Sequence, residues 1–102
     1  MAKTKVVWTT NAKIDLSEIG SYIAQDSSAR VVEFTQRLFD STVQLEDFPL
    51  SGPLCPEDPT CRQLAMEGYR IIYEVSEIGI DVLTIIPPGR EAVRAVASAK
   101  KR

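Results

Sequence analysis

The 102-residue sequence contains no histidine and only two cysteines, Cys55 and Cys61. Without histidine, Ser-His-Asp and Cys-His catalysis and every histidine-ligated zinc arrangement are excluded. Two cysteines cannot close a zinc site by themselves. We therefore expect no metal site and no cofactor. In a reducing cytosol both cysteines are expected to be free thiols, and a local disulfide between them stays open as an alternative.

Long hydrophobic runs are also lacking. No uninterrupted apolar stretch approaches the roughly 18–20 residues that cross a bilayer. The first ten residues, MAKTKVVWTT, lack the apolar core and cleavage site of a secretory signal. These absences predict a cytoplasmic protein without membrane association. The length and the 44% hydrophobic content predict one domain, residues 1–102, whose single core needs no disulfide or metal.

The charges are unevenly distributed. Residues 90–102 hold five Lys/Arg against one Glu, a net charge of +4, whereas residues 1–89 hold seven against thirteen, a net charge of −6. A nucleic-acid-binding domain usually carries a basic surface. The acidic residues 1–89 therefore count against strong non-specific binding of RNA or DNA, although a local arginine site remains compatible with them. The basic tail, residues 90–102, can equally be a solubilising or frayed end.

The first half of the chain predicts a strand and two helices. Lys3–Thr10 is β-branched and carries the only tryptophan, which indicates a strand. Thr10 or Asn11 can then cap a helix over Ala12–Gln25, where apolar residues recur every three or four positions. A second helix is predicted from Ala29 to Asp47, antiparallel to the first because the connection is so short. A loop with four prolines follows over residues 49–60.

The second half predicts three antiparallel strands, within the run RQLAMEGYRIIYEVSEIGIDVLTII. The strands are Cys61–Met66, Tyr69–Ser76 and Ile80–Ile86, and the last is apolar enough to lie in the centre of the sheet. Glu67-Gly68 is a plausible two-residue turn with glycine at a positive φ. A short helix is possible over residues 91–99.

Alternation along the middle strand separates its side chains into two faces. One face is uniformly apolar and is predicted to contact the core; it carries Tyr69, Ile71, Tyr73 and Val75. Arg70 and Ile72 then lie on the opposite face. The predicted fold class is α+β, in the order β-α-α-β-β-β, with the helix hairpin packed on one face of a small, mainly antiparallel sheet. The other face is expected to stay partly open.

These residues resemble a known family when they are taken in order. The motifs are a tryptophan-bearing strand, DLxEI at Asp15–Ile19, a Leu-x-x-Phe-Pro-x-x-Gly run at Leu45–Gly52, GYRIIY at Gly68–Tyr73 and Gly89-Arg90. The set is similar to the RelE/ParE toxins of bacterial type II toxin–antitoxin systems over roughly residues 5–91. The resemblance implies this fold and a toxin that a cognate antitoxin protein neutralises.

Two mechanisms are implied by the resemblance. RelE-like members cut mRNA on the ribosome, and ParE-like members poison DNA gyrase. RNA-cleaving relatives carry lysines at positions that correspond to Cys61 and Gln63 here, and a Tyr or His in the tail, which residues 91–102 lack. Arg70 and Arg90 match the two arginines of the nuclease, and Glu91 is the only nearby candidate for an acid or base.

The sequence therefore favours a ParE-like toxin that binds a protein target, with the mRNA endonuclease as the alternative. A protein-interaction module whose toxin activity has been lost is a third possibility. The predicted target-binding residues are Arg70, Arg90 and Arg62, although alternation places Arg62 on the opposite face from Arg70. The simpler interpretation of an arginine on a strand is a solvated residue or one half of an ion pair.

Overall fold

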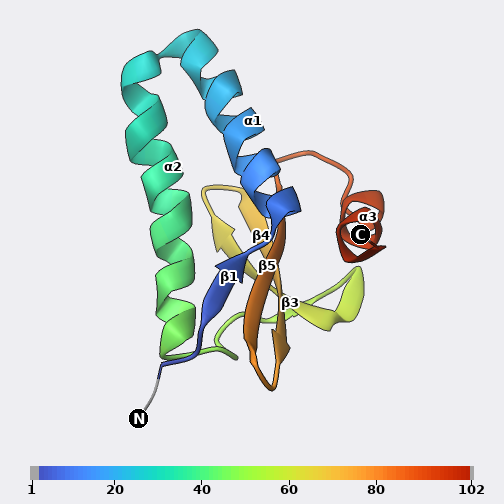
Figure 1. The fold of residues 1–102 in the computed structure, drawn as a ribbon. Helices are drawn as coiled ribbons and strands as arrows, with labels where there is room; N and C mark the ends of the chain where they lie inside the picture. Colours follow the sequence, from blue (N-terminus) through green and yellow to red (C-terminus); the bar gives the residue numbers. More distant parts are fainter. Residues whose placement is uncertain (1–2, 102) are drawn as a thin grey trace.

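The computed structural model describes residues 3–101 as two helices, a five-stranded sheet and a third helix (Figure 1). In chain order the elements are β1 (Val6–Trp8), α1 (Thr10–Asp26), α2 (Ser28–Val43), the 3-10 turn η1 (Gln44–Glu46), β2 (Leu54–Cys55), β3 (Asp58–Met66), β4 (Tyr69–Ser76), β5 (Gly79–Ile86) and α3 (Val93–Lys101). The predicted α+β class and its element order are confirmed, with β2 added before the three long strands.

The two first helices form the predicted antiparallel hairpin, which extends well past the end of the sheet (Figure 1). The cap of α1 is Thr9, whose hydroxyl accepts a hydrogen bond from the backbone amide of Ala12, rather than Thr10 or Asn11. The prediction missed it because all three residue types cap well and the strand ends two residues earlier than expected. Helix α2 also ends sooner than predicted, since the chain tightens into η1 after Val43.

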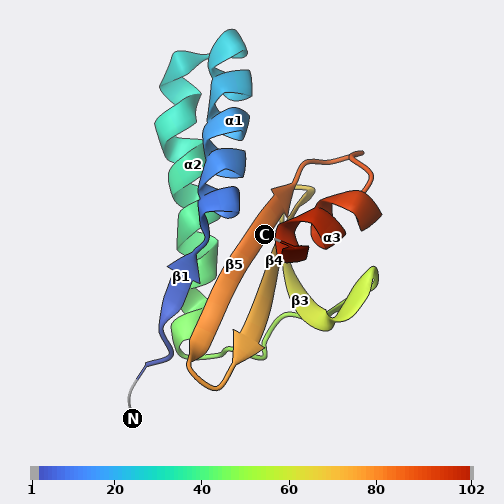
Figure 2. The same cartoon turned by 45° about the vertical axis from the view of Figure 1, so that its right-hand side comes forward.

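The sheet has the order β1-β5-β4-β3-β2. β5 is an interior strand between β1 and β4, as predicted (Figure 2), and β4 is the middle strand. β1 pairs with β5 in parallel and the other pairs are antiparallel. Glu67 and Gly68 have φ values of 52° and 86° and join β3 to β4, which confirms the predicted turn. The predicted loop 49–60 ends in β2 and the first residues of β3, so it is shorter than expected.

The first face of the sheet packs against the hairpin, as predicted from β4. Ile71 and Tyr73 are fully buried there, and Tyr69 and Val75 are partly buried at its margin. Trp8 joins β1 to α2, because its indole Nε1 donates to the Thr42 hydroxyl at 3.2 Å. This face therefore forms the main core between the sheet and the helices.

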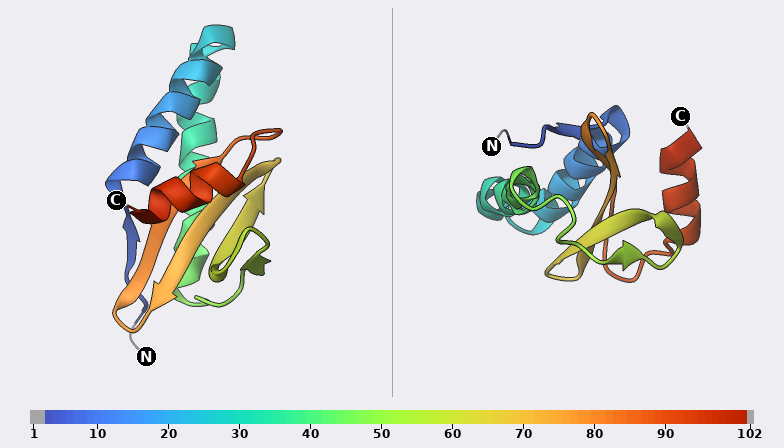
Figure 3. Two further views of the ribbon diagram at one scale, coloured as in Figure 1. Left: turned by 90° about the vertical axis from the view of Figure 1, so that its right-hand side faces the viewer. Right: turned by 90° about the horizontal axis from the view of Figure 1, so that it is seen from below.

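The second face is partly open, as expected, but helix α3 covers more of it than the sequence indicated. The part beneath α3 is enclosed between the hairpin and this helix (Figure 3). Arg70 and Glu74 on the same face keep 26% and 38% of their side chains accessible. The residues that α3 helps to bury include Ile72, Leu83 and Ile86, which contact Val96 and Ala99 within one cluster. Three apolar side chains that face the same side of two neighbouring strands need such a cover.

Helix α3 is fixed at both ends. The Glu91 carboxylate accepts hydrogen bonds from the backbone amides of Val93 and Arg94 at the start of the helix. At the other end, Lys100 Nζ lies 2.8 Å from the Asp58 carboxylate and also donates to the Thr60 hydroxyl. The alternative of a frayed end is thus wrong for residues 93–101, whereas the short helix considered over residues 91–99 is present as α3. Arg102, the last residue of the basic tail, lies outside the described residues.

The turn before β2 is tied to the first face by two side chains. The Tyr73 hydroxyl accepts a hydrogen bond from the Gly52 amide at 3.0 Å, and Arg62 donates to the Gly52 carbonyl at 2.8 Å. A β-carbon on Gly52 would stand 2.3 Å from the Gln63 carbonyl oxygen and 2.7 Å from the Tyr73 hydroxyl. Only glycine fits between these groups without moving the backbone.

Among residues 3–101, no helix is long and apolar enough to cross a membrane.

We predict that Gly52→Ala destabilises the fold by about 1–3 kcal/mol, since an added methyl group must displace backbone. The matched control is Gly20→Ala, because a β-carbon there meets Thr35 and Val31 at ordinary distances of 3.5 and 3.6 Å. In a helix, replacing glycine by alanine should raise the free energy of unfolding by about 0.5–1 kcal/mol. Chemical denaturation of the two variants measures both free energies of unfolding. Equal stability of the two variants would contradict the close packing at Gly52.

Candidate functional site

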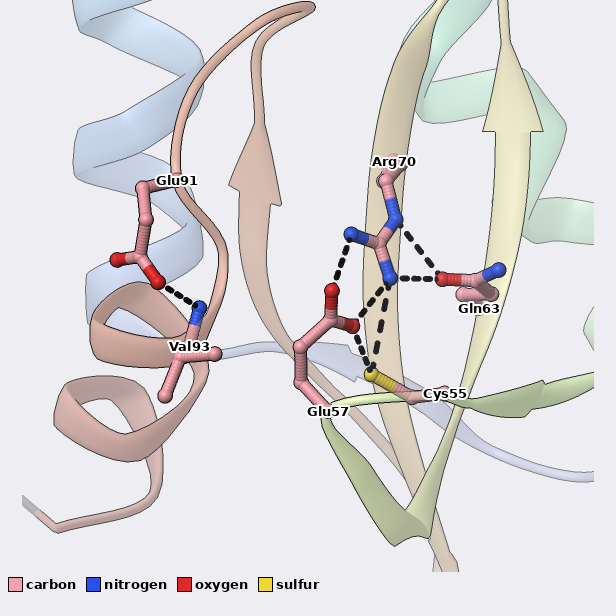
Figure 4. A network of polar contacts seen from close by, with 6 residues as sticks. All are labelled: Cys55, Glu57, Gln63, Arg70, Glu91 and Val93. Atoms are coloured by element: carbon pink, nitrogen blue, oxygen red, sulfur yellow. Dashed lines mark hydrogen bonds and ion pairs between the residues drawn. The ribbon is translucent and has the colours of Figure 1, made fainter.

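Arg70 on β4 is held by a network of polar contacts on the second face (Figure 4). Its Nη1 and Nη2 atoms donate to the two carboxylate oxygens of Glu57 at 3.0 and 2.6 Å. Its Nε donates to the side-chain oxygen of Gln63 at 2.9 Å, and Nη2 also contacts the Cys55 sulfur at 3.9 Å. The guanidinium thus forms a bidentate ion pair with a carboxylate of the same chain.

The Arg70–Glu57 pair is only partly exposed, with 26% and 21% of the two side chains accessible. Hydrogen bonding from Arg70 lowers the pKa of Glu57 from an ordinary 4.5 to about 2. The same contact raises the pKa of Arg70. Both groups are therefore charged at neutral pH, and Glu57 compensates the charge of the arginine. The interpretation of Arg70 as half of an ion pair is confirmed, with an acidic partner from the turn before β3.

The positions occupied by lysine in RNA-cleaving relatives hold side chains without a charge. Gln63 accepts hydrogen bonds from Arg70, and Cys61 is buried in the cluster beneath α3. Cys61 and Cys55 are both free thiols. Burial raises the pKa of each thiol, so neither is ready to act as a base or nucleophile at neutral pH. The alternative of a disulfide is not formed.

Arg62 and Arg70 lie on opposite faces, as alternation predicted. Arg62 extends toward the turn before β2 and donates to the carbonyls of Gly52 and Leu50 at 2.8 and 3.4 Å. Arg70 bonds to Gln63, the next residue along β3. The structure therefore does not bring these two arginines into one cluster.

Arg90 and Glu91 lie on the loop after β5. The Arg90 side chain is exposed and forms no hydrogen bond or ion pair with any residue in the range 3–101, whereas its backbone amide donates to the Pro87 carbonyl. The Glu91 carboxylate is turned to the start of α3, away from Arg70 (Figure 4). Of the predicted site arginines, Arg90 alone forms no side-chain hydrogen bond or ion pair with residues 3–101.

A cleft of about 720 Å³ opens beside this loop, between α1 and residues 87–91. Its lining residues are Asp15, Glu18, Ile19, Tyr22, Tyr69, Ile85, Pro87, Pro88, Gly89, Arg90 and Glu91. The sequence did not predict this cleft, because its walls come from three separate parts of the chain. It also did not predict Glu57, whose loop position carries no periodic signal. Within the described range, no group of three or more potential ligands could hold a metal ion.

The depressed pKa of Glu57 leads to a prediction about acid stability. The pKa lies near 4.5 in the unfolded chain and near 2 in the fold, so the pair stabilises the protein fully above about pH 4.5. This contribution is lost as the pH falls from about 4.5 to 2. In Glu57→Gln we expect a lower melting temperature at pH 7 and a shallower decrease below pH 5, measured by circular dichroism.

Glu77→Gln is the matched control for that experiment, because Glu77 is exposed in the turn between β4 and β5 and makes no ion pair among the described residues. Its acid profile should follow the wild type. Asp58 has a pKa of about 2 beside Lys100, so part of the acid sensitivity should persist in Glu57→Gln. Parallel profiles for wild type and Glu57→Gln would show that the ion pair does not stabilise the fold.

Comparison with known proteins connects this geometry to a family. Residues 6–91 match the family model described as the ParE toxin of the type II toxin–antitoxin system parDE. A structure of the chromosomal ParDE system from P. aeruginosa has a TM-score of 0.74 and 22% identity, covering 84% of this chain and 97% of that chain. A search of curated proteins finds no match.

Two further solved structures share the fold. The E. coli toxin RelE, with two arginines replaced by alanine and in the free state, has a TM-score of 0.66 and 19% identity, covering 100% of this chain and 98% of that chain. A RelBE toxin–antitoxin complex from M. tuberculosis has a TM-score of 0.55 and 22% identity, covering 83% of this chain and 98% of that chain. The family match extends from β1 to the loop after β5 and includes every strand of the sheet. The chain therefore belongs to the ParE toxins of type II toxin–antitoxin systems.

Proposed function

We propose that this toxin inhibits growth by binding a protein target, DNA gyrase, and that a cognate antitoxin neutralises it. The observation that carries the proposal is the Arg70–Glu57 pair. The Glu57 carboxylate already accepts hydrogen bonds from the two guanidinium nitrogens that a bound phosphate would need. The family membership supplies the toxin role, and the composition of the second face supports binding over hydrolysis.

RNA cleavage needs a base for the 2′-hydroxyl, cations for the developing phosphorane charge and an acid for the leaving oxygen. On the second face, Gln63 and Cys61 offer no positive charge, and Arg70 is compensated by Glu57. Glu91 is engaged with the amides that open α3. None of these side chains is therefore free to act as a general acid or base.

Two surfaces support the binding role. Arg90 is exposed and forms no ion pair with residues 3–101, and arginines that become buried on binding are frequent anchors of protein interfaces. The outer side of α2 also exposes large apolar residues at helical spacing, namely Val32, Phe39 and Val43. Phe39 stacks on Trp8 with ring centroids 5.8 Å apart, so this apolar stripe is continuous with β1. We propose the stripe as the antitoxin-binding surface and Arg90 as a contact to the target.

The mRNA endonuclease remains the second candidate, since the structural similarity to RelE covers the full length of this chain. It would require Glu57 to release Arg70 so that Arg70 and Arg90 could both contact RNA. The interaction module without toxicity is the third candidate, and it predicts no effect of expression on growth. The three functions therefore differ in what induced expression would do.

We expect that induction of the toxin without antitoxin arrests growth, induces the SOS response and accumulates gyrase-cleaved DNA. Arg90→Ala should raise the toxin concentration that half-inhibits purified gyrase by about tenfold or more, as expected for the loss of an interface arginine. Arg94→Ala is the matched control, because Arg94 is exposed on α3 and its side chain forms no hydrogen bond or ion pair with residues 3–101. Codon-positioned mRNA cuts that disappear in Arg70→Ala would overturn the gyrase proposal.

A further inference from the structure

The cleft between α1 and residues 87–91 is lined in part by apolar and aromatic side chains. Ile19 and Tyr22 come from α1, Tyr69 comes from β4, and Pro87 and Pro88 close the opposite side. Tyr69 is held in place by an edge-to-face contact with Phe34, at 5.0 Å between ring centroids. Tyr22 is 70% exposed, so its ring is free to close over an occupant. The volume lies within the range of cavities that hold small ligands or a long side chain.

Three carboxylates and one guanidinium line this cleft, so its net charge is −2. Asp15 is held by one oxygen, which accepts from the Thr84 hydroxyl and the Ile85 amide. Its other oxygen accepts no hydrogen bond from residues 3–101 and is not buried. Glu91 is likewise fixed by the amides of Val93 and Arg94. The acceptors are therefore positioned before any ligand arrives.

This combination selects a flat cation. A guanidinium stacks on tyrosine rings and bonds to carboxylates through several N–H groups, and its apolar stem suits a wall of proline and isoleucine. A phosphate or a nucleotide would meet three carboxylates and only Arg90 as an attractive charge. Lysine could reach the same carboxylates but would gain less from the rings.

We infer that the cleft between α1 and residues 87–91 is a binding site for an arginine side chain that a protein partner presents. Charge complementarity identifies the class of occupant, and the fixed acceptors identify where its guanidinium is held. Arg90 forms no ion pair with the cleft carboxylates, but its positive charge at the rim repels an incoming arginine. Binding of an arginine in this cleft does not depend on gyrase as the target.

The probe for this site is arginine amide, with citrulline amide as the uncharged control of nearly the same shape. The chain has only three tyrosines, so labelling their rings for NMR gives a self-contained assay. Tyr22 and Tyr69 line the cleft, whereas buried Tyr73 bonds to Gly52 and serves as the internal reference. Arginine amide should shift the resonances of Tyr22 and Tyr69 but not Tyr73, with a Kd in the range of about 1–10 mM. Equal shifts with citrulline amide would overturn the inference.

Two variants should change the affinity for arginine amide in opposite directions. Glu18→Gln should weaken arginine amide binding about threefold to fivefold, and Arg90→Ala should strengthen it by a similar factor. Glu33→Gln, an exposed carboxylate on α2, is the matched control and should leave the Kd unchanged. Tighter binding of 5′-AMP than of arginine amide, lost in Arg90→Ala, would show an anion site and overturn the inference.

A second set of measurements identifies the source of the arginine and rests on the proposed toxin function. If the antitoxin supplies it, Glu18→Gln should weaken antitoxin binding at least threefold and leave gyrase inhibition unchanged. If the target supplies it, the reverse should hold. No change in either assay would overturn the role of the site in partner binding. Failure of the probe experiment would leave the gyrase proposal standing, because that experiment uses the toxin alone.

Discussion

The structure depends on one constraint: a single sheet in a short chain presents an apolar face on each side. Ile71 and Tyr73 point to the hairpin, whereas Ile72, Leu83 and Ile86 point away from it. Each face must be removed from water, and the helix hairpin can cover only one of them. Helix α3 covers the other face, so the basic end of the chain stabilises the fold. Its Lys100 forms an ion pair with Asp58 on β3.

The same cover determines what the second face can do chemically. Arg70 lies at the margin of a packed surface, where an uncompensated charge would be costly, and Glu57 supplies the compensating charge. A phosphate that approached Arg70 would have to displace this carboxylate.

Much of the fold could be predicted from the sequence because its elements carry strong periodic patterns. The alternation in β4 assigned Ile71 and Tyr73 to the core, and the alternation in β3 and β4 together separated Arg62 from Arg70. The structure confirms both. The cover by α3 was missed because its apolar residues are alanines and valines, which give a weak signal until their partners on the sheet are known. The partner of Arg70 was missed because an ion pair between a loop and a strand depends on tertiary structure, which no local pattern encodes.

The parallel pairing of β1 with β5 has a consequence for how the molecule is made. Thr9, directly after β1, bonds to Val82, 73 positions later in the chain. During synthesis β1 therefore has no pairing partner until β5, near the end of the chain, has emerged from the ribosome. Pairings of such long sequence separation form late and slowly. We expect the nascent chain to remain without its complete sheet for most of translation, which leaves an interval in which a newly made toxin cannot yet act on the cell that produces it.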